Sequence, residues 1–216
     1  DGVDLAFDAG GVWVITGPAS SGKTVLLSML RGERQPDAGD VVVSGESLYR
    51  GGPAAVRSFR AASGNIPEQP AAEPGRTVEE LFRLSALAGG GMKEGEYRER
   101  QAYLLSMVGL DGAEPWRLGS LSTSERARAA LAAELLRGPR FLFADGVVAA
   151  AGKPHWFMLG GLFRALAREG NVVVLAERHL PERWSAAAGE GEATGPFRVF
   201  RLPLTAPSEP AVRPER

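Results

Sequence analysis

One segment near the N-terminus constrains the fold of this 216-residue chain more than any other. Residues Val12–Thr16 form an apolar, β-branched run that predicts a buried strand. The strand leads directly into Gly-Pro-Ala-Ser-Ser-Gly-Lys-Thr at positions 17–24, and apolar residues at 25–30 predict a helix that ends near Gly32. A strand, a loop of pattern Gly-x4-Gly-Lys-Thr and a helix together indicate a phosphate-binding loop, or P-loop, in an α/β fold.

The residue types of this loop suit a nucleotide phosphate. Gly17 and Gly22 let the backbone wrap closely, so that successive N–H groups point at phosphate oxygens, and the helix N-terminus adds a positive dipole end. Lys23 is expected to bind the β- and γ-phosphates, and Thr24 to offer its hydroxyl to Mg²⁺. The alternative is a Gly/Ser turn that binds nothing. The expected nucleotide contacts are Gly17, Pro18, Ala19, Ser20, Ser21, Gly22, Lys23, Thr24 and Val25.

An acidic residue far along the chain is expected to act together with this loop. Residues Phe141–Ala144 predict a buried strand that ends at Asp145. Beside a P-loop, an aspartate at the end of such a strand holds the Mg²⁺ shell, although the same residue could simply cap a turn. We therefore expect Mg²⁺ between Thr24 and Asp145.

The remaining pattern favours alternating helices and strands with a mostly parallel sheet. Two capping boxes, at Thr77–Glu80 and Ser122–Glu125, predict the starts of two helices, the second of which runs to Arg137. Residues 51–76 lack a clear period and predict an ordered loop region around one strand. Residues 205–216 hold three prolines and predict a disordered tail. Further predicted elements are helices at 96–108 and 156–168 and strands at 41–43, 172–176 and 197–202.

Composition argues against several function classes. The net charge of −1 argues against a nucleic-acid partner bound through bulk charge. The chain has no cysteine and only two histidines, which excludes thiol chemistry and argues against a histidine metal cage. No run of about 18 apolar residues is present, so the chain is not expected to span a membrane itself. The chain does not begin with Met, and we expect further natural sequence, including part of an N-terminal strand, before Asp1.

The order of four segments resembles that of ATP-binding-cassette (ABC) ATPases. These segments are the P-loop, Ile66–Pro70, Leu121–Glu125 and Phe141–Asp145, and the resemblance covers roughly residues 3–184. The run Asn-Ile-Pro-Glu-Gln-Pro at 65–70, followed by Thr77–Glu80, looks most like the ATPases of ABC-2-type exporters, including the gliding-motility kind. The resemblance implies a P-loop NTPase of the ABC type, with a nucleotide-binding domain over residues 1–204 and a helical signature subdomain over about 77–137.

The resemblance also implies cofactors and partners. It implies a dimer, homomeric or heteromeric, in which each ATP lies between the P-loop of one subunit and the signature helix of the other, where Ser122 would bind. Gln69 matches the family's Q-loop glutamine, which contacts Mg²⁺ and the transmembrane partner. The family would place the chain in the cytoplasm, peripheral to the membrane on a permease subunit. The adenine-stacking aromatic of the family would precede Asp1.

The chain departs from the family's pattern in four ways. Gly146 stands where the family has its catalytic glutamate, and Arg178 stands at the switch histidine, with His179 one place later. Thr123 and Ser124 replace the signature glycines, and their side chains are expected to crowd the opposite site. Residues 147–152 lack the aspartate that contacts the partner subunit. We therefore expect no catalytic residue in its usual place.

These departures leave three functional hypotheses. The first is an ATP-binding transport subunit that binds MgATP, dimerises and hydrolyses little on its own. The second is an active ATPase with an unorthodox base such as Glu177 or His179, and the third is a structural or regulatory adaptor. A P-loop kinase would leave residues 121–145 unexplained. The Gln69 loop and the helix from Thr77 to Leu87 are expected to contact another protein, because the helix carries more apolar residues than one core stripe needs. The alternative is that all of these residues face the chain's own core; they are Leu81, Phe82, Leu84 and Leu87.

Overall fold

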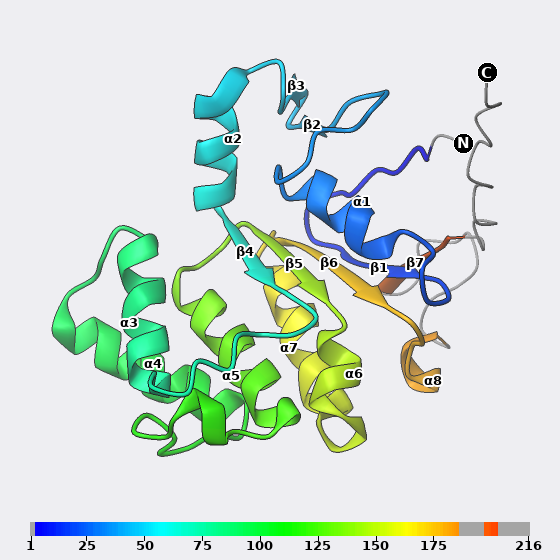
Figure 1. The fold of residues 1–216 in the computed structure, drawn as a ribbon. Coiled ribbons are helices and arrows are strands. Elements are labelled where there is room, and N and C mark those ends of the chain that lie inside the picture. The colour runs from blue at the N-terminus through cyan, green and yellow to red at the C-terminus, as the bar shows by residue number, and fades with distance from the viewer. Residues whose placement is uncertain (1–2, 186–196, 203–216) are drawn as a thin grey trace, which may run out of the picture.

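Five parallel strands form the central sheet in the order β4-β5-β6-β1-β7 (Figure 1). The computed structural model describes residues 3–185 and 197–202. All neighbouring strands of this sheet pair in parallel, so their carboxyl ends share one edge. The predicted mostly parallel α/β fold is thereby confirmed. The strands are β1 (Val12–Thr16), β4 (Ser63–Ile66), β5 (Phe141–Asp145), β6 (Val172–Glu177) and β7 (Phe197–Arg201), beside a small antiparallel pair of β2 (Val42–Val43) and β3 (Glu46–Ser47).

Helices cover both faces of the sheet, which explains why its strands are apolar throughout. Val12 and Val14 of β1 belong to one buried cluster, and Trp13 and Ile15 belong to the other, because alternate residues point to opposite faces. The second cluster contains residues of α1 (Lys23–Leu30) and α2 (Gly52–Ala61). The first contains residues of α5 (Thr123–Leu136), α6 (Val147–Ala151) and α7 (Trp156–Arg168).

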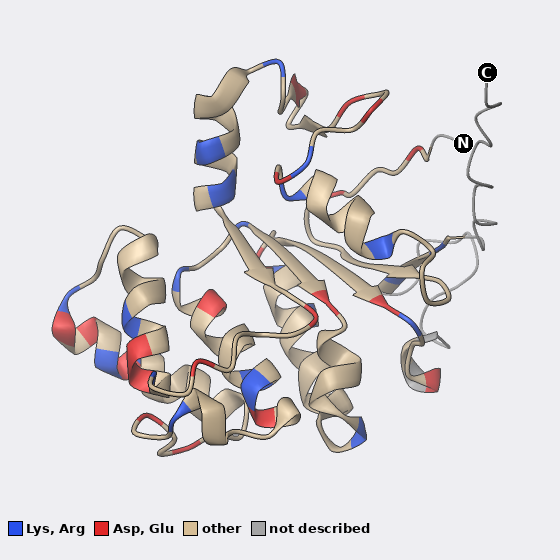
Figure 2. Ribbon diagram, viewed as in Figure 1, with Lys and Arg blue, Asp and Glu red and all other residues tan. Residues whose placement is uncertain are grey.

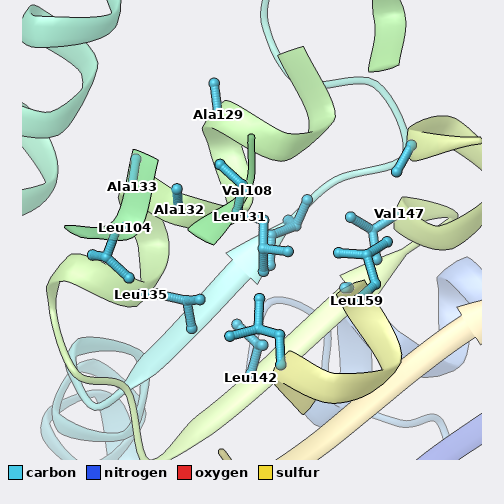
Figure 3. Close-up of a cluster of buried hydrophobic side chains, with 14 of the residues drawn as sticks. Leu104, Val108, Ala129, Leu131, Ala132, Ala133, Leu135, Leu142, Val147 and Leu159 are labelled. Carbon is cyan, nitrogen blue, oxygen red and sulfur yellow. The ribbon is translucent and has the colours of Figure 1, made fainter. Parts of the chain in front are cut away.

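Two further helices, α3 (Val78–Ala88) and α4 (Glu94–Met107), pack on α5 away from the sheet (Figure 1). Figure 3 shows side chains of α4 and α5 gathering around Leu131 and Leu135, with Leu142 of β5 beneath them. Both predicted capping boxes are present, with Thr77 and Ser122 as the N-caps. These helices occupy residues 77–137, the segment that we propose as the helical subdomain. Short elements complete the described chain: η1 (Leu118–Ser120), η2 (Lys153–His155) and α8 (Glu182–Ser185).

The prediction for residues 51–76 is wrong in part. This segment contains β4 as expected, but it also contains the ten-residue helix α2. The Gly/Pro/Ala composition hid the helix, although Pro53 lies in its first turn and Val56 and Phe59 are one turn apart. Phe59 packs on Phe141 and Phe143, so tertiary burial stabilises a helix whose own apolar stripe is narrow. The predicted edge strand β7 is confirmed, and the predicted tail 205–216 lies outside the described residues.

Charged residues of both signs are mixed along α3, α4 and α5, and acidic residues also stand at the ends of β5 and β6 (Figure 2). Within residues 3–185 and 197–202, no helix is long and apolar enough to cross a bilayer. In open α/β sheets ligands bind at the carboxyl ends of the strands, so a ligand site is expected at this edge, where the acidic strand ends lie.

Candidate functional site

The loop between β1 and α1 requires glycine at two positions. Gly22 is the N-cap of α1 with φ +87°, a left-handed conformation that side chains disfavour. A Cβ on Gly17 would lie 2.6 Å from Ser21 Oγ and 3.0 Å from the carbonyl oxygen of Leu202. The motif glycines therefore permit a tight turn that places the N-terminus of α1 at the carboxyl edge of the sheet.

The amine of Lys23 lies inside this loop. Its Nζ donates hydrogen bonds to the carbonyl oxygens of Gly17 and Pro18, both at 2.7 Å, and to Ser21 Oγ at 3.2 Å. The residue is only 8% exposed. A compact positive charge thus stands in the concavity of the loop beside the N-terminus of α1, which is the arrangement that attracts phosphate groups.

Thr24 and Asp145 meet across the sheet edge. Thr24 Oγ1 donates a hydrogen bond of 2.7 Å to Asp145 Oδ2, which joins the first turn of α1 to the end of β5. Asp145 is 6% exposed. A hydroxyl and a carboxylate are oxygen donors that suit Mg²⁺, which usually keeps several waters and uses one or two carboxylates rather than a full protein cage. Among the described residues, no three carboxylate, histidine or cysteine side chains gather to hold a metal ion.

Glu68 lies at this edge, two residues after the end of β4. Ile66 pairs with Ala144, so Glu68 comes level with Gly146, and a Cβ on Gly146 would lie 3.3 Å from Glu68 Cγ. The Glu68 carboxylate forms an ion pair with Arg178 at 3.4 Å. Gln69, expected to contact Mg²⁺, is exposed, and within the described part of the chain it has no hydrogen bond to Thr24 or Asp145. Sequence reasoning missed Glu68; its only signal was the position directly before Gln69.

Glu177 is a buried carboxylate that holds α6 in place. It is 1% exposed, and its two oxygens accept hydrogen bonds from the backbone N–H groups of Val148, at 2.7 Å, and Ala149, at 3.3 Å. Because Glu177 is buried and both oxygens face the first turn of α6, its carboxylate is not accessible to an attacking water. The hypothesis of Glu177 as general base therefore loses its support, while His179 is exposed. Gly146, the N-cap of α6, has φ +64° and is strained for any side chain.

Glu177 predicts a pH dependence of stability. Burial raises its pKa from 4.5 to about 7, against the opposing effect of the two N–H donors. The folded state therefore binds this proton more tightly than the unfolded state does. The resulting stabilisation of the fold is complete below about pH 4.5 and is lost as pH rises through about 7. Relative to Glu177→Gln, the parent's free energy of unfolding should fall by up to about 3 kcal/mol between pH 5 and pH 8, measured by urea denaturation. The exposed Glu169→Gln serves as control, and equal pH slopes in parent and Glu177→Gln would contradict the prediction.

The N-terminus of α5 differs from the expectation at one residue. Ser122 Oγ donates to Glu125 Oε2 at 2.6 Å and accepts from the Glu125 backbone N–H at 3.2 Å, and Ser122 itself is exposed at the helix start. Ser124 was expected to crowd the opposite site. Its hydroxyl instead donates to the carbonyl oxygen of Ala151 at 2.6 Å, so this side chain turns toward α6 of its own chain. Thr123 is exposed, and its expected effect on the opposite site stays a prediction.

Comparison with known proteins gives a consistent result. Residues 1–149 match the family model described as "ABC transporter". The energy-coupling factor transporter ATP-binding protein EcfA1 of Thermotoga maritima is 32% identical over 181 residues, covering 82% of this chain and 66% of that protein. The methionine import ATP-binding protein MetN of Protochlamydia amoebophila is 32% identical over 143 residues, covering 66% of this chain and 42% of that protein. The chain thus spans two thirds or less of the length of these relatives.

Solved structures agree on the fold. A structure described as the ATP-binding subunit of an ABC transporter has a TM-score of 0.74 at 21% identity, and it covers 92% of this chain and 79% of that one. The dimeric structure of MJ0796, a bacterial ABC transporter cassette, has a TM-score of 0.73 at 22% identity, with coverage of 82% and 78%. At these identities the likeness concerns the fold alone.

Proposed function

Because the chain belongs to the ABC transporter family of ATP-binding proteins, we propose that it is the ATP-binding subunit of a transport complex and binds MgATP at residues 17–24. The observation that carries the proposal is the Thr24–Asp145 hydrogen bond beside a loop that encloses the Lys23 amine. Lys23 and Thr24 belong to α1 and Asp145 belongs to β5, so the hydrogen-bonded pair is 121 residues apart in the sequence. If the loop were only a turn and Asp145 only a turn cap, their contact would not be expected.

Each group has a defined part in binding. The backbone N–H groups of the loop would donate hydrogen bonds to the phosphate chain. The Lys23 amine would neutralise part of its charge by leaving or sharing its bonds to the carbonyl oxygens of Gly17 and Pro18. Thr24 and Asp145 would hold the shell of Mg²⁺, which would supply positive charge beside the phosphate oxygens. Glu177 fixes α6 and thereby the turn at Gly146 that follows Asp145.

We infer that hydrolysis by the chain alone is weak. A positioned general base contributes roughly 10²–10⁴-fold in rate. The usual position of that base is Gly146, whose φ of +64° and closeness to Glu68 also oppose a glutamate there. Gly146→Glu by itself is therefore not expected to restore activity.

A calorimetric titration beside an ATPase assay tests the function. The purified chain should bind ATP in a Mg²⁺-dependent manner, as shown by weaker binding in EDTA, and its turnover should stay near background. A turnover of several per second that depends on Lys23 would favour an active ATPase. Failure to bind ATP with or without Mg²⁺ would contradict the proposal and favour the adaptor.

Two binding partners are also proposed. We propose a nucleotide-sandwich dimer in which Ser122 faces the partner's ATP, and a permease that holds the chain peripherally at the cytoplasmic side of a membrane. The MetN relative is named as a methionine import protein, so the ABC-2 exporter subgroup stays a prediction without support from it.

The partner surface itself needs a correction. Phe82 is fully buried in the chain's own core, whereas Leu84 is 45% and Leu87 is 70% exposed on α3. Leu84 also lines an open cleft of about 710 Å³ together with Arg76 and Glu80. We propose that Leu84 and Leu87, without Phe82, form the apolar part of the surface that contacts the permease.

A further inference from the structure

The chain around α2 carries positive charge and no negative charge. Residues 47–67 contain three arginines, Arg50, Arg57 and Arg60, and no aspartate or glutamate. Figure 2 shows the consequence: the charged residues of α2 are all basic, whereas both signs are mixed on α3, α4 and α5. The net charge of the whole chain is −1, so α2 is a local basic feature of a nearly neutral molecule.

Two of these arginines lack a partner of their own. Arg57 and Arg60 are both exposed, and their spacing of three residues places them on one face of α2. Within the part of the chain that the structure describes, neither guanidinium forms an ion pair or a hydrogen bond. Arg50, in contrast, pairs with Asp40 at 3.7 Å. The face of α2 with Arg57 and Arg60 therefore presents two uncompensated positive charges.

The exposed face of α2 suits an anionic surface better than a protein or a nucleic acid. The other exposed side chains of this helix are small and include Ala54, Ser58 and Ala61. In α2, all of which the structure describes, no large apolar side chain is exposed, so a protein partner would find no apolar anchor. Single-stranded nucleic acid stacks its bases on exposed aromatic rings, and Phe59 of α2 is buried. Recognition here therefore depends on charge.

A cleft beside α2 has room for a phosphate group. It has a volume of about 380 Å³ and lies between α2 and the segments before it, with Gln35, Tyr49, Val56 and Arg57 among its lining residues. The Arg57 guanidinium and the Gln35 amide are hydrogen-bond donors that no other described side chain uses. A planar guanidinium matches two oxygens of a phosphate, so the cleft and Arg57 together suit a phosphate headgroup.

The basic end of α2 lies beside the end of α3 that carries the exposed leucines. Arg137 donates a hydrogen bond of 2.9 Å to the carbonyl oxygen of Ala61, the last residue of α2. The same side chain packs on Gly89, which follows α3, since a Cβ on Gly89 would lie 3.4 Å from Arg137 Cβ. Leu87, part of the proposed permease contact, is two residues before Gly89. Because a permease lies in a membrane, a surface beside its contact lies close to lipid headgroups.

We propose that α2 binds anionic phospholipid headgroups through Arg57 and Arg60. The choice of a membrane as the source of the phosphate groups rests on the proposed function. Anionic lipids give the cytoplasmic leaflet a negative surface potential, which attracts arginines near it and which salt weakens. The contact holds the chain with α2 and the leucines of α3 toward the bilayer, in addition to whatever the permease contributes.

Sedimentation with sucrose-loaded vesicles, in about 0.1 M salt, tests the proposal. The parent should bind vesicles of phosphatidylcholine with phosphatidylglycerol at least about tenfold more strongly than vesicles of phosphatidylcholine alone. Arg57→Gln combined with Arg60→Gln should weaken this binding by about fivefold for each arginine removed. The matched control, Lys93→Gln with Lys153→Gln, removes two exposed cations outside α2 and should change binding by less than about twofold. All four side chains are exposed, so both variants should keep the parent's melting temperature.

Four other results would decide against the proposal. Equal binding to both kinds of vesicle would exclude recognition of anionic headgroups. Equal losses in the arginine and lysine variants would assign the binding to overall charge rather than to α2. Release of the chain by inorganic phosphate, at constant ionic strength, would make the cleft a site for a free phosphate. Loss of permease co-purification by the arginine variant, in detergent without added lipid, would make a protein the partner of α2.

The vesicle assay needs no nucleotide, so its outcome is separate from that of the proposed function. A parent that binds MgATP but neither kind of vesicle would refute the lipid contact and leave the proposed function standing. A parent that binds anionic vesicles through Arg57 and Arg60 but does not bind MgATP would support the lipid contact and refute the nucleotide site.

Discussion

Lys23→Ala is expected to weaken MgATP binding at least tenfold, which corresponds to about 1.4 kcal/mol. The Lys23 amine is the positive charge enclosed by the loop, within 2.7 Å of two of its carbonyl oxygens. Without this charge, the phosphate chain would face the loop carbonyls and the Asp145 carboxylate with less compensation. Isothermal titration calorimetry on parent and variant measures the difference directly.

A matched lysine separates this site effect from net charge. Lys93 is exposed at the start of α4, away from the sheet edge, so Lys93→Ala removes the same charge elsewhere and should leave the affinity unchanged. If Lys23→Ala and the parent bind MgATP equally, residues 17–24 are not the phosphate site. Thermal melting of both variants checks that each is folded when it is titrated.

Phe82→Glu is expected to abolish cooperative folding. Phe82 is fully buried in the main core cluster. Loss of a buried phenylalanine costs about 3–5 kcal/mol, and an unpaired carboxylate in its place adds a further desolvation cost. Native proteins are stable by only about 5–15 kcal/mol, so the sum is comparable to the whole. The measurement is a thermal melt followed by circular dichroism.

The control on the same helix is Leu87→Glu. Leu87 is 70% exposed on α3, so this variant should keep the parent's melting temperature while it loses co-purification with a membrane partner. A parent-like melt for Phe82→Glu would mean that Phe82 is on the surface after all. Retained co-purification of Leu87→Glu would exclude Leu87 from the partner surface.

Local patterns were enough for much of the fold. Residues 12–15 and 141–144 are continuous apolar runs, as strands covered on both faces must be. The capping boxes at Thr77 and Ser122 are present because each one satisfies backbone donors within four residues. The missed helix α2 has no capping box, and it is stabilised by the packing of Phe59 on β5, a strand far along the chain that no local pattern connects with it.

Some residues of the candidate site could likewise be predicted from local patterns, and others could not. The phosphate loop could be predicted because all its groups lie within residues 17–24, and Asp145 could be predicted because it ends a buried strand. The nearness of Glu68 to Gly146 could not, because it depends on the register of β4 on β5. The inward turn of Ser124 likewise depends on where α6 ends.

By itself, the sequence therefore determined the features whose partners are a few residues apart: the loop, the helix starts and the apolar strands. Only the tertiary structure decided which side chains meet across the sheet edge. Glu177 faces α6 rather than water, Glu68 pairs with Arg178 over Gly146, and Phe82 is buried while Leu87 is exposed. The physical reason is that strand register and helix packing set these contacts, and both depend on burial summed over the whole chain rather than on any local pattern.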